Sequence, residues 1–177
     1  PLQKIAPFLS AANIDLKGWD DDFYRNVCGG DFMPVLNTLK LMKKLNIFVE
    51  VTTLAVTGFV DDESILRDIA RFIKNELGAE TPWHISRFFP QYHYASAPPT
   101  PPKVLQRARE IGLDEGLRYV YIGNIMDGGG ENTNCYSCGE RLIHRSGYQI
   151  LSNKILNNKC PACGAVIDGI GISGDEK

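Results

Sequence analysis

The sequence predicts an α/β protein built on a parallel sheet and followed by a small metal-binding module. Two observations lead to this prediction. Through residue 123, four apolar or β-branched segments alternate with amphipathic helical segments. This is the order of a parallel sheet with right-handed crossovers. Two Cys-x-x-Cys pairs then follow close together near the C-terminus. We therefore expect two domains, residues 1–130 and 131–177.

Four segments are expected to be strands. The first is residues 11–16, and the third and fourth are residues 83–89 and 118–123. The second, residues 47–56, is β-branched and almost continuously apolar. Such a run is typical of a parallel strand that is buried on both faces.

Amphipathic helices are expected between these strands. Asp31 is placed to cap the first helix, with Pro34 in its first turn. Asp61 or Asp62 can cap the second helix, in which apolar residues recur every four positions. Gly78 is expected to end that helix.

The remaining segments complete the expected order of elements. Residues 1–9 resemble the tail of a helix, and residues 18–30 are expected to be a polar loop. A Pro-rich loop spans residues 89–102, where Thr100 and the two prolines after it open the third helix. Residues 124–134 are expected to be a Gly-rich linker.

Four βα units amount to about half of a (β/α)₈ barrel. The sequence therefore predicts a partial, half TIM-type parallel βα barrel with a small C-terminal four-cysteine metal-ribbon module. A half barrel has an open edge and an exposed inner face. Because residues 47–56 are strongly apolar, we expect that inner face to be apolar too. An apolar face favours a homo-oligomer or another partner chain.

The two cysteine pairs have the pattern of a metal site. Cys135-Tyr-Ser-Cys138 and Cys160-Pro-Ala-Cys163 are separated by 21 residues, and each is followed by Gly. Gly can adopt positive φ and lets the backbone turn under the sulfur. Four thiolates form a closed tetrahedral site for Zn, with Fe as the alternative. Two disulfides or four unrelated buried thiols would also account for the cysteines, but nothing else in the chain indicates secretion.

Composition excludes several classes of protein. A formal net charge of −2 over 177 residues gives no electrostatic basis for binding nucleic acid or an anionic membrane. No apolar run is long enough to span a bilayer. Only Cys28 lies outside the cysteine pairs, which fits a reducing, cytoplasmic compartment. The chain begins with Pro1 and has no signal-peptide pattern, so we expect a piece of a longer protein.

Polar side chains gather where the predicted strands end, which is where parallel sheets carry their chemistry. Asp15 and Lys17 alternate along the first strand and can therefore face the same side. Tyr92 and His93 follow the third strand. The alternative interpretations are a surface ion pair for the first two residues and a structural loop histidine for His93.

Some of these segments resemble the radical-SAM enzymes that activate glycyl-radical enzymes. The matching segments are Ile14-Asp15-Leu16-Lys17-Gly18, the strand that ends Val56-Thr57-Gly58, and Phe88-Phe-Pro-Gln-Tyr-His93. Residues 83–164 more closely resemble AmmeMemoRadiSam-system radical SAM proteins. That likeness rests on His84-Ile-Ser-Arg-Phe-Phe-Pro90, Pro98-Pro-Thr-Pro101, Gly116-Leu-Arg-Tyr-Val-Tyr-Ile-Gly-Asn124, Glu131-Asn-Thr133 and both cysteine pairs.

The resemblance implies a partial TIM barrel that binds a [4Fe-4S] cluster and S-adenosylmethionine. Reductive cleavage of the cofactor would give a 5′-deoxyadenosyl radical that abstracts hydrogen from a substrate. Asp15 and Lys17 would contact the cofactor, and Tyr92 and His93 would line the substrate wall. Activases often place an Arg against the cofactor carboxylate in the strand that corresponds to residues 47–56. Here Thr52 or Glu50 occupies that neighbourhood, and we assign the contact to Thr52.

The sequence departs from the family in one respect. The Cys-x-x-x-Cys-x-x-Cys motif that holds the cluster is absent, and Cys28 alone cannot replace it. We therefore expect the carboxyl-terminal portion of a radical SAM enzyme, inactive by itself, that acts with its missing half on a protein or small-molecule substrate. The alternatives are a non-catalytic zinc-ribbon scaffold that docks another chain, and a nucleic-acid-binding ribbon. The latter is disfavoured because residues 135–177 contain no dense basic cluster.

Overall fold

The computed structural model describes residues 1–125 and 129–174. The chain divides into two compact units, Pro1–Ile125 and Met126–Lys177. Each unit has a sheet of its own: four strands in the first unit and three in the second.

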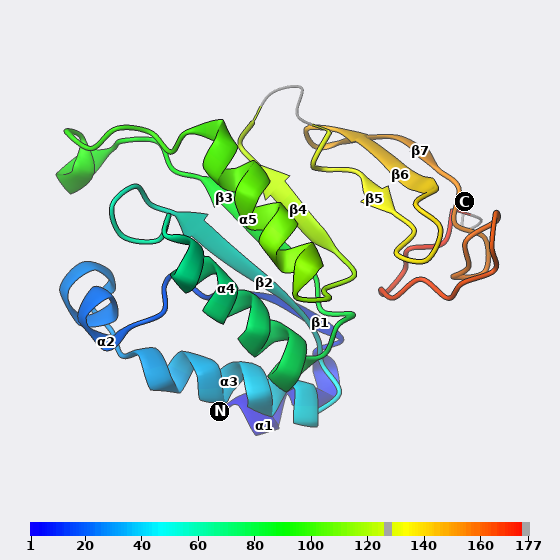
Figure 1. Ribbon diagram of the computed structural model, residues 1–177. Coiled ribbons are helices and arrows are strands. Elements are labelled where there is room, and N and C mark those ends of the chain that lie inside the picture. The colour runs from blue at the N-terminus through cyan, green and yellow to red at the C-terminus, as the bar shows by residue number, and fades with distance from the viewer. Residues whose placement is uncertain (126–128, 175–177) are drawn as a thin grey trace. The chain divides into compact units, whose positions relative to one another are not determined.

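The first unit is a mixed α/β structure around a four-stranded parallel sheet (Figure 1). The strands lie side by side in chain order, β1-β2-β3-β4, and every neighbouring pair is parallel. Their bounds are Ala11–Asp15 for β1, Phe48–Ala55 for β2, Trp83–Arg87 for β3 and Val120–Gly123 for β4. The predicted strands are all present and slightly shorter than expected.

Three helices connect the strands and lie on the same face of the sheet (Figure 1). They are α3 (Phe32–Lys44), α4 (Glu63–Phe72) and α5 (Pro102–Asp114). Helix α4 continues as a π-helical turn, Ile73–Leu77, and ends at Gly78, whose φ of 109° suits glycine. Shorter helical segments are α1 (Leu2–Ile5) and the 3₁₀ turns Ala6–Phe8 and Tyr92–Tyr94.

The two predicted aspartate caps behave differently. Asp62 caps α4, because its side chain accepts a hydrogen bond from the backbone N–H of Ser64 at 2.7 Å. Asp31 precedes α3, but its side chain makes no capping hydrogen bond. Its carboxylate instead lies 3.5 Å from Arg25 Nε.

The prediction of a loop at residues 18–30 is wrong for most of that segment. Helix α2 (Asp21–Phe23) begins there and continues as a π-helical turn, Tyr24–Cys28. The side chain of Asp20 caps α2 by accepting from the N–H of Phe23 at 2.6 Å. Phe23 and Tyr24 are buried in the core, so tertiary packing stabilises a segment that lacks a long apolar stripe.

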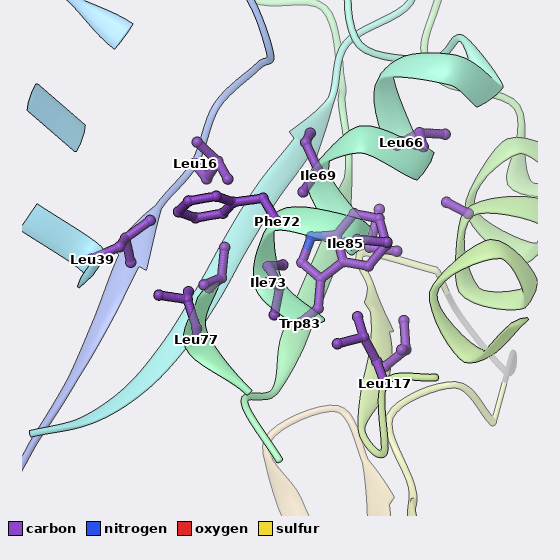
Figure 2. Packing of buried hydrophobic residues seen from close by; sticks show 14 of the residues in the cluster. Leu16, Leu39, Leu66, Ile69, Phe72, Ile73, Leu77, Trp83, Ile85 and Leu117 are labelled. Carbon is purple, nitrogen blue, oxygen red and sulfur yellow. The ribbon is translucent and has the colours of Figure 1, made fainter. Parts of the chain in front are cut away.

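The core lies between the sheet and its helices, as Figure 2 shows around Trp83. Trp83 is fully buried, and its indole N–H donates to the buried Thr53 hydroxyl at 3.0 Å. Buried aliphatic and aromatic side chains from the strands and helices surround it, among them Leu16, Leu39, Leu66, Ile69, Phe72, Ile73, Leu77, Ile85 and Leu117.

Strand β2 differs from the prediction that it is buried on both faces. Its side chains alternate between buried and half-buried positions along the strand. Val49, Val51, Thr53 and Ala55 are buried, while the intervening residues face away from the helices. Within residues 1–125 and 129–174, the helices that connect the strands therefore cover one face of this sheet.

Thr100 has a different role from the predicted start of α5. Pro101 occupies the N-cap position of the helix without a side-chain capping hydrogen bond, and Thr100, one residue earlier, is fully buried. Its hydroxyl donates to the carbonyl of Ala55 and accepts from the N–H of Phe88 at 3.2 Å. Thr100 thus joins the end of the Pro-rich loop to the carboxyl ends of β2 and β3.

The second unit is a small antiparallel module. Its strands are β5 (Thr133–Asn134), β6 (Arg141–Ser146) and β7 (Gln149–Asn153), in that order. Strand β5 lies within the segment that was expected to be a linker. The first cysteine pair lies between β5 and β6, and the second follows β7.

Candidate metal centre and the helix-free face of the sheet

The four cysteines lie on two turns with matching backbone geometry. In the first turn, the N–H of Gly139 donates to the carbonyl of Cys135 at 2.8 Å, and the N–H of Cys135 donates to the carbonyl of Glu140 at 2.8 Å. The second turn, within residues 160–165, makes the same two bonds, both at 2.9 Å. The glycine after each pair has positive φ, 78° at Gly139 and 75° in the second turn. The predicted reason for those glycines is thus confirmed.

The sulfur positions fit a tetrahedral metal ion. All four Sγ atoms lie within 4.8 Å of one another. The distances are 3.6 Å between Cys135 and Cys163 and 3.7 Å between Cys138 and Cys160. Sulfurs at the corners of a zinc tetrahedron with bonds of about 2.3 Å lie about 3.8 Å apart. None of the five cysteines forms a disulfide, so the donor set suits zinc or iron.

Electrostatics in the cluster favours a bound cation. The backbone N–H of Ala165 donates to Cys163 and lowers the pKa of that thiol to about 7, and the neighbouring thiol of Cys138 acts in the same direction. The backbone N–H of Glu140 also favours the thiolate of Cys138, but the surrounding sulfurs raise the pKa of Cys138 to about 12. Closely spaced thiolates repel one another, and a divalent cation removes that repulsion.

The face of the parallel sheet that α3, α4 and α5 leave uncovered is the second place where polar groups gather. We call it the helix-free face. The strand registers place Asp15, Thr52, His84 and Tyr121 opposite one another in a row across all four strands. The face consists of Ala11, Asn13, Asp15, Phe48, Glu50, Thr52, Leu54, His84, Ser86, Tyr121 and Gly123.

The expectation of an apolar inner face is therefore wrong. Strand β2 contributes Glu50 and Thr52 to this face beside Phe48 and Leu54. The apolar residues of the 47–56 run lie mainly on the other face, under the helices. Sequence reasoning overlooked this because the run contains only one charged residue.

Asp15 and Lys17 form an ion pair at the end of β1, with 2.6 Å between Lys17 Nζ and Asp15 Oδ2. Both side chains are about half exposed and accessible to a ligand. The backbone beside them is anchored, because the N–H of Lys17 donates to the Tyr24 hydroxyl at 2.9 Å. Burial raises the pKa of Tyr24, which keeps that hydroxyl neutral.

Thr52 lies opposite Asp15 on the neighbouring strand. Its hydroxyl donates to Asn13 Oδ1 at 2.8 Å, which links β1 to β2 across the helix-free face. Asp15, Lys17 and Thr52, the three residues predicted to contact a cofactor, therefore come from one region of the sheet.

A second polar group on this face lies on the other side of β2. His84 Nε2 is 2.9 Å from Glu50 Oε2. The imidazole also stacks on the ring of Tyr121, with centroids 5.0 Å apart and planes inclined by 22°. The predicted site residues do not include Glu50, His84 and Tyr121 as a group. Glu50 and His84 are 34 positions apart in the sequence, so no local pattern indicates their contact.

Tyr92 and His93, the predicted substrate residues, lie on the loop after β3. Both are exposed, and their rings are 3.7 Å apart between centroids. Tyr94 holds this loop against Phe59 through an edge-on ring contact with centroids 5.8 Å apart.

A hollow of about 320 Å³ lies beside the carboxyl ends of β1 and β2. Helix α2, its π-helical continuation and the turn after β2 line it, through Asp20, Asp22, Phe23, Asn26, Val27, Gly58 and Phe59. The neighbouring Thr57 hydroxyl is buried without a hydrogen-bond partner among the residues that the structure describes. Sequence reasoning missed this hollow because it expected α2 to be a loop.

Comparison with known proteins finds a curated relative and a solved structure of the same fold. No family model matches the chain. An uncharacterized protein of Methanocaldococcus jannaschii, MJ0808, is 47% identical over 165 residues, which cover 90% of this chain and 48% of that protein. The chain thus spans about half the length of the curated relative that it matches.

A solved structure shares the fold. It is a domain of a pyruvate-formate lyase-activating enzyme from Bacteroides vulgatus, which matches with a TM-score of 0.58 and 20% identity. The match covers 70% of this chain and 73% of that one. The four-stranded parallel α/β unit is therefore similar to an activating-enzyme domain. Within the described residues, no helix is both long and apolar enough to cross a membrane.

Proposed function

We propose that this chain is the carboxyl-terminal part of a radical SAM protein and that its parallel sheet is half of a TIM-type barrel. The strands follow one another in chain order, and the three connecting helices lie on one face (Figure 1). Consecutive units of a (β/α)₈ barrel have this arrangement, with the helix-free face turned inward. The fold likeness to an activating-enzyme domain supports the proposal.

The Asp15–Lys17 pair is the observation that carries this function. It presents a carboxylate and an ammonium group 2.6 Å apart at the carboxyl end of β1. Such a pair can hold the ammonium and carboxylate of an amino-acid group together. We assign that ligand as the methionyl part of S-adenosylmethionine, with Thr52 beside it on β2. When bound next to a [4Fe-4S] cluster held by another segment, this cofactor would supply the 5′-deoxyadenosyl radical.

The other residues take supporting roles in the proposal. Tyr92 and His93 would line the wall on the substrate side. The four-cysteine module would hold zinc as a closed structural site, since all four ligand positions are filled by protein sulfur. Iron would be its alternative occupant.

The test uses the full-length protein with its cluster reconstituted, under reducing and anaerobic conditions. The wild type should release 5′-deoxyadenosine. Lys17→Ala or Asp15→Ala should lower that release at least about tenfold, as loss of a charged contact worth about 1.5–3 kcal/mol would. Lys44→Ala, on the exposed end of α3, is the matched control and should leave the release unchanged.

If the cluster forms and both substitutions leave cofactor cleavage unchanged, the assignment of Asp15 and Lys17 is wrong. If the full-length protein never cleaves the cofactor, the enzyme function is wrong. The alternative is a non-catalytic zinc-ribbon scaffold that binds another protein.

One observation favours that second candidate. Tyr148 in the β6–β7 turn is fully exposed, and Ile150 and Leu151 on β7 are more than half exposed. Exposed apolar side chains on an edge strand suit a protein partner or a second copy of the chain. Light scattering of the purified chain tests self-association. Monomers at all accessible concentrations would contradict a homo-oligomer.

A further inference from the structure

The side chains of Glu50, His84 and Tyr121 form a group on the helix-free face that takes no part in the proposed cofactor contacts. The imidazole of His84 is held in two ways, by a 2.9 Å contact from Nε2 to the Glu50 carboxylate and by stacking on Tyr121. The three residues come from three neighbouring strands, so the sheet itself fixes their positions.

Glu50 determines which ring nitrogen is available. An ionised carboxylate only accepts hydrogen bonds, so the neutral imidazole carries its proton on Nε2. The lone pair is then on Nδ1. Among residues 1–125 and 129–174, Nδ1 of His84 has no hydrogen-bond partner. With a side chain that is 32% exposed, His84 is within reach of a ligand on the helix-free face.

We propose that His84 is an acid–base residue that accepts a proton at Nδ1 from an O–H or N–H group of the substrate. Glu50 is the positioning residue that selects the tautomer, and Tyr121 holds the ring plane. This inference rests on the proposed function, because it assigns Asp15 and Lys17 to the cofactor. His84 lies two strands from Asp15, or about 10 Å across the sheet, and therefore faces the other reactant.

The step is a proton transfer and is balanced without any redox partner. The O–H or N–H bond of the substrate breaks, an N–H bond forms at Nδ1, and the electron pair remains on the substrate. The imidazolium that forms is paired with the Glu50 carboxylate 2.9 Å away, which stabilises the positive charge, although less than a buried carboxylate would because the Glu50 side chain is 39% exposed. The expected substrate is a polar small molecule or side chain that presents a hydroxyl or an amine.

The first measurement is the tautomer of His84 in the zinc-loaded chain, from the nitrogen chemical shifts of the imidazole. The wild type should carry the proton on Nε2. In Glu50→Gln, the amide can donate to Nε2, so a substantial fraction should carry the proton on Nδ1. Glu76→Gln removes a carboxylate that pairs with Lys40, and it should leave the His84 tautomer unchanged.

The second measurement is the rate at which diethyl pyrocarbonate modifies each of the three histidines, read from their peptides by mass spectrometry. At about pH 8, where imidazoles are mostly neutral, Glu50→Gln should slow the modification of His84 by about threefold or more. His93 and His144 are internal controls and should keep their rates. His84→Gln should have an unchanged melting temperature. That result would show that loss of the imidazole does not unfold the sheet.

His84 protonated on Nδ1 in the wild type would overturn the proposal. An unchanged modification rate in Glu50→Gln would do the same. Neither measurement uses S-adenosylmethionine. If the full-length protein does not cleave the cofactor but His84 has the expected tautomer and modification rate, only the proposed function is rejected. If the cofactor is cleaved but the tautomer or the modification rate of His84 differs from the expected result, only the role of His84 is rejected.

Discussion

The α/β unit and the four-cysteine module are stabilised by different means. The first has a continuous core of buried side chains around Trp83, between a sheet and three helices. The second buries few large apolar side chains, namely Leu142, Ile143, Ile155 and Ile167, beside two of its cysteines. A module this small has too little core to be stable without a further constraint. Burial of apolar side chains is thus sufficient for the first unit, whereas the second needs a constraint of the kind that a metal ion at its four cysteines would supply.

Metal removal should affect the two units most unequally. Structural zinc contributes about 10–16 kcal/mol in small domains, which exceeds what the core of this module can supply. A strong chelator should therefore unfold residues 129–174 and leave β1–β4 folded. Hydrogen exchange followed by mass spectrometry measures this: amides of β6 and β7 should lose protection, and those of the parallel sheet should keep it.

Cys28→Ser is the control for metal removal, because Cys28 lies in the first unit and should not change the expected stoichiometry of one metal per chain. A metal-free chain in which β6 and β7 remain protected would show that the module does not depend on metal.

Truncation of Trp83 should have the opposite selectivity. The side chain is fully buried in the core of the first unit. Trp83→Ala should lower the free energy of unfolding of that unit by about 3–5 kcal/mol, because a cavity replaces the ring. Urea denaturation measures the change, and Phe8→Ala, at an 89% exposed position, is the control. Loss of zinc from Trp83→Ala would contradict the separation of the two units.

The glycines of the two cysteine turns should be equivalent. Gly139 and Gly164 have φ of 78° and 75°, and no atom would clash with an added Cβ at either position. An alanine at either position would be destabilised by its positive φ alone and not by a steric clash. Gly139→Ala or Gly164→Ala should therefore each weaken zinc binding by about 1–2 kcal/mol, or about 5–30-fold. Competition with a chromogenic chelator measures the affinity. Gly30→Ala also adds a methyl group in open space, and its effect on zinc should be absent.

The smallest effect concerns pH and the first unit alone. Glu115 accepts hydrogen bonds from Arg67 at 2.7 Å and Arg71 at 3.1 Å, and these bonds lower its pKa below the ordinary value of 4.5. A pKa that is lower in the folded state gives stability that is present above about 4.5 and is lost as pH falls through the folded pKa. Wild type should thus be slightly more stable than Glu115→Gln near neutral pH, and the gap should close in acid.

Tryptophan fluorescence can follow that gap, because Trp19 and Trp83, the two tryptophans of the chain, both lie in the first unit. Acid release of the metal from the module then does not disturb the reading. A gap that stays constant from neutral pH into acid would contradict the role of the carboxylate.

Much of the fold could be predicted because its signals are local. The β-branched runs, the Asp62 cap and the prolines before α5 each act within a few residues, and the predicted strands and helices formed there. Helix α2 was missed because its stability depends on burial of Phe23 and Tyr24 against segments distant in the sequence. Local propensity gives little information about such a helix.

The candidate sites divide in the same way. The amino-acid sequence alone determined the two cysteine turns of the candidate metal site, because two-residue spacing and a following glycine suffice to form each turn. Only the tertiary structure decided that Glu50 and His84 meet, since they lie on different strands and the parallel register brings them together. The tertiary structure also decided which side of β2 is covered, because α3, α4 and α5 pack on the same face of the sheet. Short-range geometry is encoded in adjacent residues, whereas a site across strands exists only once the sheet has formed.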